Sequence, residues 1–159
     1  FGTHSSIIGD EQIERTSVFI AGTDQYLRAV DLHTGKQRWN FLTDYPLVDS
    51  PFYLNDAVYQ RVPNVGLVAL NAFPDSLSGD QLWIADDVHG NVITTTKRGQ
   101  LVTWDEHSEV LQIVDPRKGG LVATLPLPNT KELLTDQSSI GDIFILTEQD
   151  ILLRLVPRN

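Results

Sequence analysis

The sequence predicts an all-β fold built from about four copies of a small antiparallel sheet with four strands. Short runs of β-branched, aromatic and aliphatic residues are separated by turns rich in Gly, Pro, Asn and Asp. No segment of convincing length has the 3.6-residue period of a helix. A five-residue pattern recurs as LRAVD, LVALN, LQIVD and LRLVP, beginning at Leu27, Leu67, Leu111 and Leu153, with spacings of 40, 44 and 42 residues. Four short strands in a repeat of roughly 40–50 residues are typical of β-propeller blades.

The first copy is predicted over residues 5–43. Its strands are expected at Ser6–Ile8, Val18–Gly22, Tyr26–Val30 and Gln37–Leu42. The polar run Gly22–Gln25 predicts a hairpin between the second and third strands. Before the fourth strand, Thr34-Gly35 predicts a turn with a positive φ angle.

The second copy is predicted over residues 49–85 in the same order. Pro51 suits the first position of a strand better than its middle, because proline cannot donate to a sheet ladder. Strands are expected at Phe52–Leu54, Ala57–Arg61 and Leu67–Asn71, with a fourth around Trp83 and a turn at Pro63–Gly66.

The third copy is predicted over residues 91–127 and the fourth over residues 136–157. Strands of the third copy are expected at Val92–Thr95, Leu101–Trp104, Leu111–Asp115 and Leu121–Leu125. Those of the fourth are expected at Ser138–Ile140, Ile143–Leu146 and Ile151–Val156, so this copy is one strand short.

The 159 residues suffice for a single domain, 1–159, with a buried core. With 41% apolar residues, no run approaches the ~18 consecutive apolar residues of a membrane span, so direct membrane insertion is not expected. The formal net charge of -9 repels a phosphate backbone, which argues against nucleic acid as a partner. The first residue is Phe1 and Met is absent, so we expect a mature product or a fragment of a longer chain.

Residues with the spacing of a catalytic or metal site are not apparent. The chain has no Cys, which removes disulfides, thiolate metal sites and a cysteine nucleophile. The histidines, at positions 4, 33, 89 and 107, lack zinc-site spacing, and Asp86-Asp87 beside His89 lacks the spacing of a calcium loop. Ser138-Ser139-Ile140-Gly141-Asp142 echoes the first copy at Ser5–Asp10, so the repeat explains it without catalysis. We therefore predict no catalytic, cofactor-binding or metal-binding residues and no cofactor.

A turn motif accompanies the repeat. In the first copy it reads Ala29-x-Asp31-x-x-Thr34-Gly35-x-x-x-Trp39. The second copy has Ala69, Asn71, Gly79 and Trp83 with four extra residues around Phe73–Ser76; the third has Asp115 and Gly119, with Ala123 in place of Trp. The pattern resembles the tryptophan-docking repeat of pyrroloquinoline-quinone-type β-propellers. That group includes quinoprotein alcohol dehydrogenases and the propeller lipoprotein of the bacterial outer-membrane β-barrel assembly machinery.

We expect the motif to be structural. An Asp or Asn bonds the backbone of its own turn, Gly adopts an unusual φ, and Trp supplies a large flat surface for packing. The resemblance implies that these residues dock one blade to the next and perform no chemistry. The expected structural residues are Ala29, Asp31, Thr34, Gly35, Trp39, Ala69, Asn71, Gly79, Trp83, Asp115 and Gly119.

The resemblance also implies a larger ring of about seven or eight blades, of which these residues would form the C-terminal half. Open edges of such a partial ring would invite association. The primary functional hypothesis is a non-enzymatic scaffold that binds a protein or peptide, periplasmic or extracellular by resemblance and placed in the bacterial envelope. Tyr45-Pro46-Leu47 and Leu125-Pro126-Leu127-Pro128 are candidate contact loops. The alternatives are a partial or degenerate quinoprotein dehydrogenase and a secreted module that binds carbohydrate or another small ligand.

Overall fold

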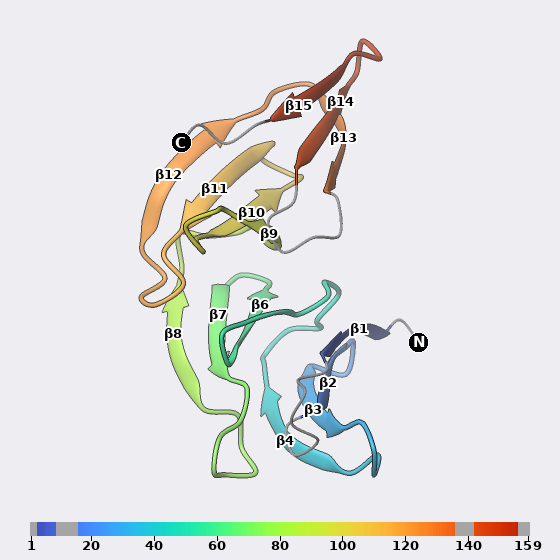
Figure 1. Cartoon of the computed structure of the whole chain (residues 1–159), viewed down its shortest axis with the longest axis vertical. Helices are drawn as coiled ribbons and strands as arrows, with labels where there is room; N and C mark the ends of the chain where they lie inside the picture. Colours follow the sequence, from blue (N-terminus) through green and yellow to red (C-terminus); the bar gives the residue numbers. More distant parts are fainter. Residues whose placement is uncertain (1–2, 9–15, 136–141, 156–159) are drawn as a thin grey trace. The chain divides into compact units, whose positions relative to one another are not determined.

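The computed structural model describes residues 3–8, 16–135 and 142–155, which form four antiparallel sheets (Figure 1). In each sheet the strands lie side by side in chain order. The first sheet contains β1 (Thr3–Ile8), β2 (Ser17–Gly22), β3 (Tyr26–Asp31) and β4 (Gln37–Leu42). The second contains β5 (Phe52–Leu54), β6 (Ala57–Val62), β7 (Gly66–Asn71) and β8 (Gln81–Ala85).

The third sheet contains β9 (Asn91–Thr95), β10 (Leu101–Asp105), β11 (Val110–Val114) and β12 (Leu121–Pro126). The fourth contains β13 (Thr130–Thr135), β14 (Ile143–Thr147) and β15 (Leu152–Leu155). The chain divides into two compact units, residues 1–91 with the first two sheets and residues 92–159 with the rest. The all-β prediction of repeated small sheets is confirmed, and no helix occurs among the described residues.

The recurring pattern found in the sequence is the third strand of each sheet: β3, β7, β11 and β15. The predicted hairpin at Gly22–Gln25 is present, with the amide of Gln25 donating to the carbonyl of Gly22 at 3.1 Å. The predicted turn at Pro63–Gly66 joins β6 to β7, with positive φ angles at Asn64 and Gly66.

The first strand of the fourth sheet differs from the prediction. It is β13, over Thr130–Thr135, which lies between the ranges 91–127 and 136–157 predicted for the third and fourth copies. Lys131 and Glu132 are exposed, as is Leu134, so this strand lacks the alternation of buried apolar residues by which strands are recognised. The predicted strand Ser138–Ile140 lies outside the described residues.

Three sheets have a β-bulge at the same position between their third and fourth strands, which could not be predicted from the sequence. The pairing of the third and fourth strands shifts register after Ala29, after Ala69 and after Ile113. Each of these residues lies two positions before the Asp or Asn of the turn motif. A bulge at this point increases the local twist and redirects the turn that follows.

The core of the first unit joins its two sheets. Phe19 of β2 contacts Trp39 of β4 and Tyr53 of β5, with ring centroids 5.9 Å apart in both pairs. Tyr53 in turn meets Phe73 at 6.3 Å. Such aromatic pairs contribute about 0.5–1.5 kcal/mol each beyond the burial of their area. In the second unit a separate cluster forms around Val102, Leu111, Ile143 and Ile145.

Candidate functional site: turn motifs and an inter-sheet cleft

The turn after β3 is organised by the carboxylate of Asp31. Its Oδ1 accepts the backbone N–H groups of His33 at 3.0 Å and Thr34 at 2.8 Å, and also the Thr34 hydroxyl at 3.0 Å. Its Oδ2 accepts from the guanidinium of Arg38 at 2.5 Å. Gly35 closes the turn with a φ angle of 68° and donates to the Asp31 carbonyl at 2.9 Å. Both carboxylate oxygens of Asp31 are therefore hydrogen-bonded, one by the turn and the other by Arg38 of β4.

These contacts stabilise the charged form of the carboxylate. The pKa of Asp31 is lowered to about 2, chiefly by the backbone N–H of Thr34 and next by its hydroxyl, with a further contribution from Arg38. A carboxylate with so low a pKa stays ionised at neutral pH and does not suit general acid–base work.

The third copy repeats this turn more simply. The Oδ1 atom of Asp115 accepts the backbone N–H of Arg117 at 2.9 Å, and Gly119, with a φ angle of 71°, donates to the Asp115 carbonyl at 2.9 Å. The backbone N–H of Arg117 is the main cause of a lowered pKa at Asp115. Lys97 and Arg98 occupy the separate turn between β9 and β10.

The second copy departs from this geometry because its turn is longer. The side chain of Asn71 accepts the backbone N–H of Phe73 at 3.0 Å, which preserves the start of the turn. Gly79, however, has no positive φ. Its lack of a side chain matters for space, since a Cβ atom there would lie 2.9 Å from Cβ of Phe41 and 3.3 Å from Cε3 of Trp39.

Trp39 lies at the centre of the first unit. It is fully buried and stands opposite Ala29 in the β3–β4 pair. Its indole Nε1 donates to the carbonyl of Ala72, at the start of the β7–β8 loop, at 2.9 Å. Through this bond Trp39 connects the outer strand of the first sheet to the second sheet, and its neighbour Phe19 makes a further connection through Tyr53 of β5.

In three sheets the pair that corresponds to Ala29 and Trp39 contains one large and one small side chain. Trp83 of β8 is paired with Ala69, just as Trp39 is paired with Ala29, and its ring meets Tyr59 at 5.6 Å. In the third sheet Ala123 is paired with Ile113. In the third sheet the larger residue, Ile113, is therefore on the third strand and the small one, Ala123, on the fourth. The larger Ile113 accompanies the loss of the tryptophan in this copy.

The longer β7–β8 loop lies against the outer edge of β4. The backbone N–H of Asn40 donates to the carbonyl of Leu77 at 3.1 Å, and the N–H of Gly79 donates to the carbonyl of Asn40 at 2.7 Å. These two bonds make a parallel bridge between Asn40 and Ser78. The lengthened β7–β8 loop therefore covers, through Leu77–Gly79, part of an edge that would otherwise be open.

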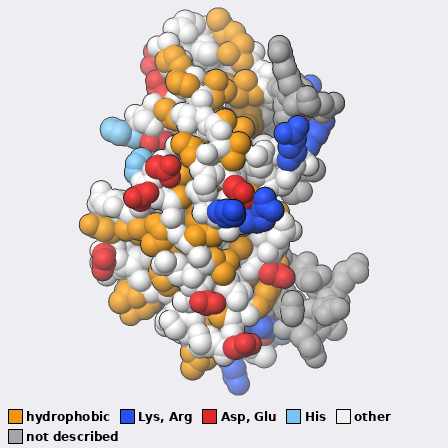
Figure 2. Space-filling model, turned by 90° about the vertical axis from the view of Figure 1, so that its left-hand side faces the viewer, with side chains coloured by type: hydrophobic (Ala, Val, Ile, Leu, Met, Phe, Trp, Pro, Cys, Tyr) orange, Lys and Arg blue, Asp and Glu red, His pale blue; other side chains and the backbone are white. Residues whose placement is uncertain are grey.

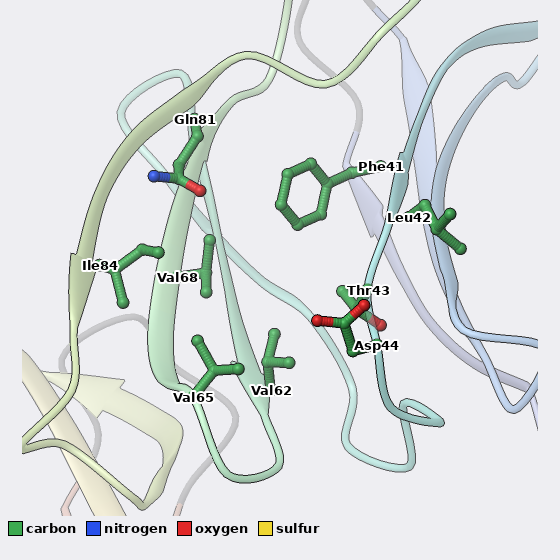
Figure 3. A pocket seen from close by; sticks show the side chains of 9 residues that line it. All are labelled: Phe41, Leu42, Thr43, Asp44, Val62, Val65, Val68, Gln81 and Ile84. Atoms are coloured by element: carbon green, nitrogen blue, oxygen red, sulfur yellow. The ribbon is translucent and has the colours of Figure 1, made fainter.

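Beyond this bridge the two sheets leave a cleft of about 160 Å³. Figure 3 shows the side chains of Phe41, Val62, Val65, Val68 and Ile84 directed toward a common space. Val62 and Val68 are buried, whereas Ile84 is 44% exposed. An engineered cavity of about 150 Å³ with similar lining accepts benzene, so the cleft has room for one apolar side chain.

The polar groups of the cleft lie at its rim. The Asp44 carboxylate borders the space beside Thr43, with Gln81 on the other side (Figure 3). The hydroxyl of Thr43 lies 3.0 Å from the carbonyl of Gln25 and 2.7 Å from that of Tyr45, and it donates its one proton within this pair of acceptors. The carboxylate of Asp44 is exposed and accepts no hydrogen bond from the described residues.

Leu42 borders the cleft through its backbone, because its side chain points away from the space (Figure 3). The N–H and carbonyl of Asn40 face outward to the β7–β8 loop, while the N–H of Thr43 faces back to Gln25 on the other side. Since backbone groups alternate along a strand, those of Leu42 face outward like those of Asn40. No described residue bonds to them, so the covered edge of β4 ends just before the cleft.

The described histidines do not come together in one site. His33, His89 and His107 are exposed, each on a different connection. The backbone carbonyl of His89 accepts from the guanidinium of Arg61 at 2.5 Å. Within the described part of the chain, no three His, Asp or Glu side chains gather as metal ligands would. Residues 138–141 of the serine-containing stretch lie outside it.

The two candidate contact loops differ in accessibility. In the first, Leu47 is fully buried and belongs to the core, so it cannot contact a partner, although Tyr45 and Pro46 are exposed. In the second, Leu125, Pro126 and Pro128 are exposed. Leu47 follows a loop and carries no strand period, so its burial had no signal in the sequence.

Apolar side chains are also exposed along outer strands. Leu82 and Ile84 project from β8, and Leu121, Val122 and Leu125 project from β12. Figure 2 shows hydrophobic side chains at the surface of one side of the molecule, among acidic side chains and fewer basic ones. No helix in the described part of the chain has the length and apolar character needed to cross a membrane.

Comparison with sequences finds no match, either to a family model or among curated proteins. Comparison with solved structures finds similar folds. The chain resembles BamB from Moraxella catarrhalis at a TM-score of 0.69 and 15% identity, over 94% of this chain and 42% of that one. It resembles the Cps50 (Swd1) β-propeller domain of Myceliophteria thermophila at a TM-score of 0.66 and 11% identity, over 87% and 47%.

A third similar structure is the computationally designed Ika4 protein, with a TM-score of 0.66 and 10% identity over 97% of this chain and 92% of that one. The chain thus spans less than half the length of the two natural propellers and nearly all of the designed protein. At these identities the likeness concerns the fold alone. Together with the four sheets it shows that the chain has the blade architecture of a β-propeller.

Proposed function

We propose that this chain is the blade-bearing part of a non-enzymatic β-propeller scaffold that binds a protein or peptide. The main support for this proposal is that the turn-motif residues Asp31 and Trp39 make contacts within the fold. The carboxylate oxygens of Asp31 are bonded by its own turn and by Arg38 of β4, and Trp39 is buried and bonds to the second sheet. These side chains are therefore occupied in holding the blades, and the surface that remains for function is the cleft and the exposed apolar outer strands.

The turn motif and the share of known propellers that the chain covers suggest a group and a larger ring for this scaffold. Because the motif resembles that of pyrroloquinoline-quinone-type propellers, we place the protein in that group, with a periplasmic or extracellular location. The motif residues named above are assigned a structural role, docking one blade to the next. The coverage of only 42% and 47% of two natural propellers supports a larger ring of which these blades are a part. Exposed outer strands give such a part further surface for association.

The scaffold proposal is tested by photo-crosslinking in the native host. A photo-reactive phenylalanine analogue is placed singly at exposed positions: Leu42, Tyr45, Ile84, Val122 and Leu125. We expect one or a few defined proteins to crosslink from a subset of positions. A matched control at Phe19, which is buried, should give none. Absence of any defined crosslinked protein from all five positions contradicts the scaffold proposal.

The dehydrogenase alternative is tested separately. The chain has no cysteine pair, and the pKa of Asp31, the best-ordered carboxylate of the motif, is too low for a general base. We therefore expect pyrroloquinoline quinone with Ca²⁺ to leave the melting temperature unchanged and to support no dye reduction with alcohols. A saturable rise in melting temperature together with dye reduction would establish the dehydrogenase instead.

A further inference from the structure

We propose that the cleft between β4 and β8 binds an extended peptide that carries an apolar side chain flanked by a cationic one. The inference rests on the scaffold function proposed above and names the site and the chemistry of its ligand. All nine lining residues belong to the first compact unit, so the site is complete within residues 1–91. Its occupant is a segment of a partner protein.

The apolar part of the ligand follows from the lining. Five of the lining side chains are apolar, and the volume of about 160 Å³ matches one Phe or Leu side chain; the five are Phe41, Val62, Val65, Val68 and Ile84. Ile84 is 44% exposed, so a bound side chain would remove it from water. Burial of apolar surface supplies the main part of the binding free energy.

The Asp44 carboxylate at the rim of the cleft indicates that the ligand carries a cationic side chain. The Asp44 carboxylate borders the cleft and has no bonding partner among the described residues, unlike the carboxylates of Asp24, Asp31 and Asp49, which are paired with Arg28, Arg38 and Arg61. The chain as a whole carries a net charge of -9, which adds a field of the same sign. A Lys or Arg next to the apolar side chain would complement both.

The free edge of β4 at Leu42 indicates that the peptide binds in an extended conformation. The outward N–H and carbonyl of Leu42 continue the row in which Asn40 already bonds to the β7–β8 loop. A peptide that follows Leu77–Gly79 along this edge would bond to Leu42 by strand addition and direct one side chain into the cleft. The loop thus marks where the chain's own pairing stops and where a ligand's pairing would begin.

The test is a titration of the full ¹⁵N-labelled chain with acetyl-Arg-Phe-Arg-amide, followed by NMR. We expect saturable shift changes at Phe41–Asp44, Val65, Val68 and Ile84. The peptides acetyl-Glu-Phe-Glu-amide and acetyl-Arg-Ser-Arg-amide should bind at least about fivefold more weakly, because each lacks one of the two interactions.

Two variants and two matched controls locate the site. Asp44→Asn should weaken binding of the Arg-Phe-Arg peptide about two- to fivefold, the range of an exposed ion pair, and Ile84→Ala should weaken it about fivefold or more. Asp75→Asn, another exposed carboxylate, and Leu82→Ala, an exposed apolar residue of β8 that does not line the cleft, should leave affinity unchanged. All four positions are exposed, so the fold is expected to persist.

The proposal is overturned if shifts at the cleft do not saturate with any peptide, if the acidic peptide binds as well as the basic one, or if the control variants weaken binding as much as the cleft variants. This outcome is distinct from failure of the scaffold proposal. Crosslinks from Val122 or Leu125 without a response in the cleft would retain the scaffold and remove this site.

Discussion

At the scale of single residues, the turn motif shows how one carboxylate can organise a connection. The sequence predicted that Asp31 and Gly35 form a polar turn, and the pattern of residue types was sufficient because the contacts are local, within seven residues. The size exchange between Trp39 opposite Ala29 and Ala123 opposite Ile113 could not be foreseen. It depends on which residues pair across strands, and the bulge after Ala29 shifts that register.

The depressed pKa of Asp31 predicts a pH dependence of stability. Because the folded-state pKa of about 2 lies below the ordinary value near 3.9, the stabilising contribution is complete above about pH 4 and is lost as pH falls toward 2. Asp31→Asn should therefore lower the melting temperature at pH 7, and the difference from the original protein should narrow between pH 4 and pH 2. Thermal unfolding followed by circular dichroism measures this. A difference that stayed constant down to pH 2 would contradict the assignment.

Gly79 is predicted to be required for space. A Cβ atom at this position would lie 2.9 Å from Cβ of Phe41, so Gly79→Ala must displace the loop or the ring. We expect the free energy of unfolding, measured with urea, to fall by about 1–3 kcal/mol. Gly120→Ala is the matched control, because a Cβ atom there meets nothing within 4 Å, and it should change stability by less than about 0.5 kcal/mol. Equal effects of the two substitutions would contradict the close approach.

At the scale of elements, strands with regular alternation were predicted to within a few residues, as β3 and β7 show. The strand β13 was missed because its side chains are largely exposed and provide no apolar period. The cleft was also beyond prediction. The sequence revealed four extra residues in the second copy, but nothing local says that the resulting loop bonds to Asn40, a residue of the preceding sheet.

The pairing of Ala29 with Trp39 predicts an energetic coupling. Both side chains are fully buried, so Ala29→Ile should overpack the site and cost about 1–3 kcal/mol, and Trp39→Ala should cost about 3–5 kcal/mol. The double variant reproduces the Ile–Ala pair of the third sheet. Its cost should be at least about 1 kcal/mol less than the sum of the single costs.

The control for this coupling combines Ala29→Ile with Trp83→Ala, which lies in the other sheet of the unit and is paired with Ala69. These two effects should add within about 0.5 kcal/mol. Urea unfolding of all five variants measures both combinations. If the changes in the free energy of unfolding were additive for Ala29→Ile and Trp39→Ala, the sizes of these two side chains would not be energetically coupled.

At the scale of the whole molecule, periodicity was the most informative property of the sequence. The spacings of 40, 44 and 42 residues predicted repeated small sheets, and the structural similarity to two natural propellers, at 15% and 11% identity, agrees with the predicted blades. Such identities also show why function is harder to read: blade architecture needs only alternation, turns and compatible pairs. Binding depends on the places where copies differ, which here means the longer β7–β8 loop and the cleft beside it.

Both the connection of the two sheets through Trp39 and the free edge at Leu42 depend on the docking of the β7–β8 loop on β4. This docking can be measured directly, since the chain has no native cysteine. Asn40 and Ser78 form a parallel bridge, and bridged strands lie about 4.7–4.9 Å apart, within the Cα range of a disulfide. The double variant Asn40→Cys, Ser78→Cys should therefore crosslink on mild oxidation.

The control pair is Lys36→Cys with Ser78→Cys, because Lys36 lies four residues before Asn40 along the chain, about 13 Å away in an extended strand. We predict nearly complete intramolecular disulfide formation for the Asn40–Ser78 pair, seen by mass spectrometry, a melting temperature at least equal to that of the reduced form, and little disulfide for the control. Slow or equal oxidation of the two pairs would contradict the docked loop and, with it, the cleft.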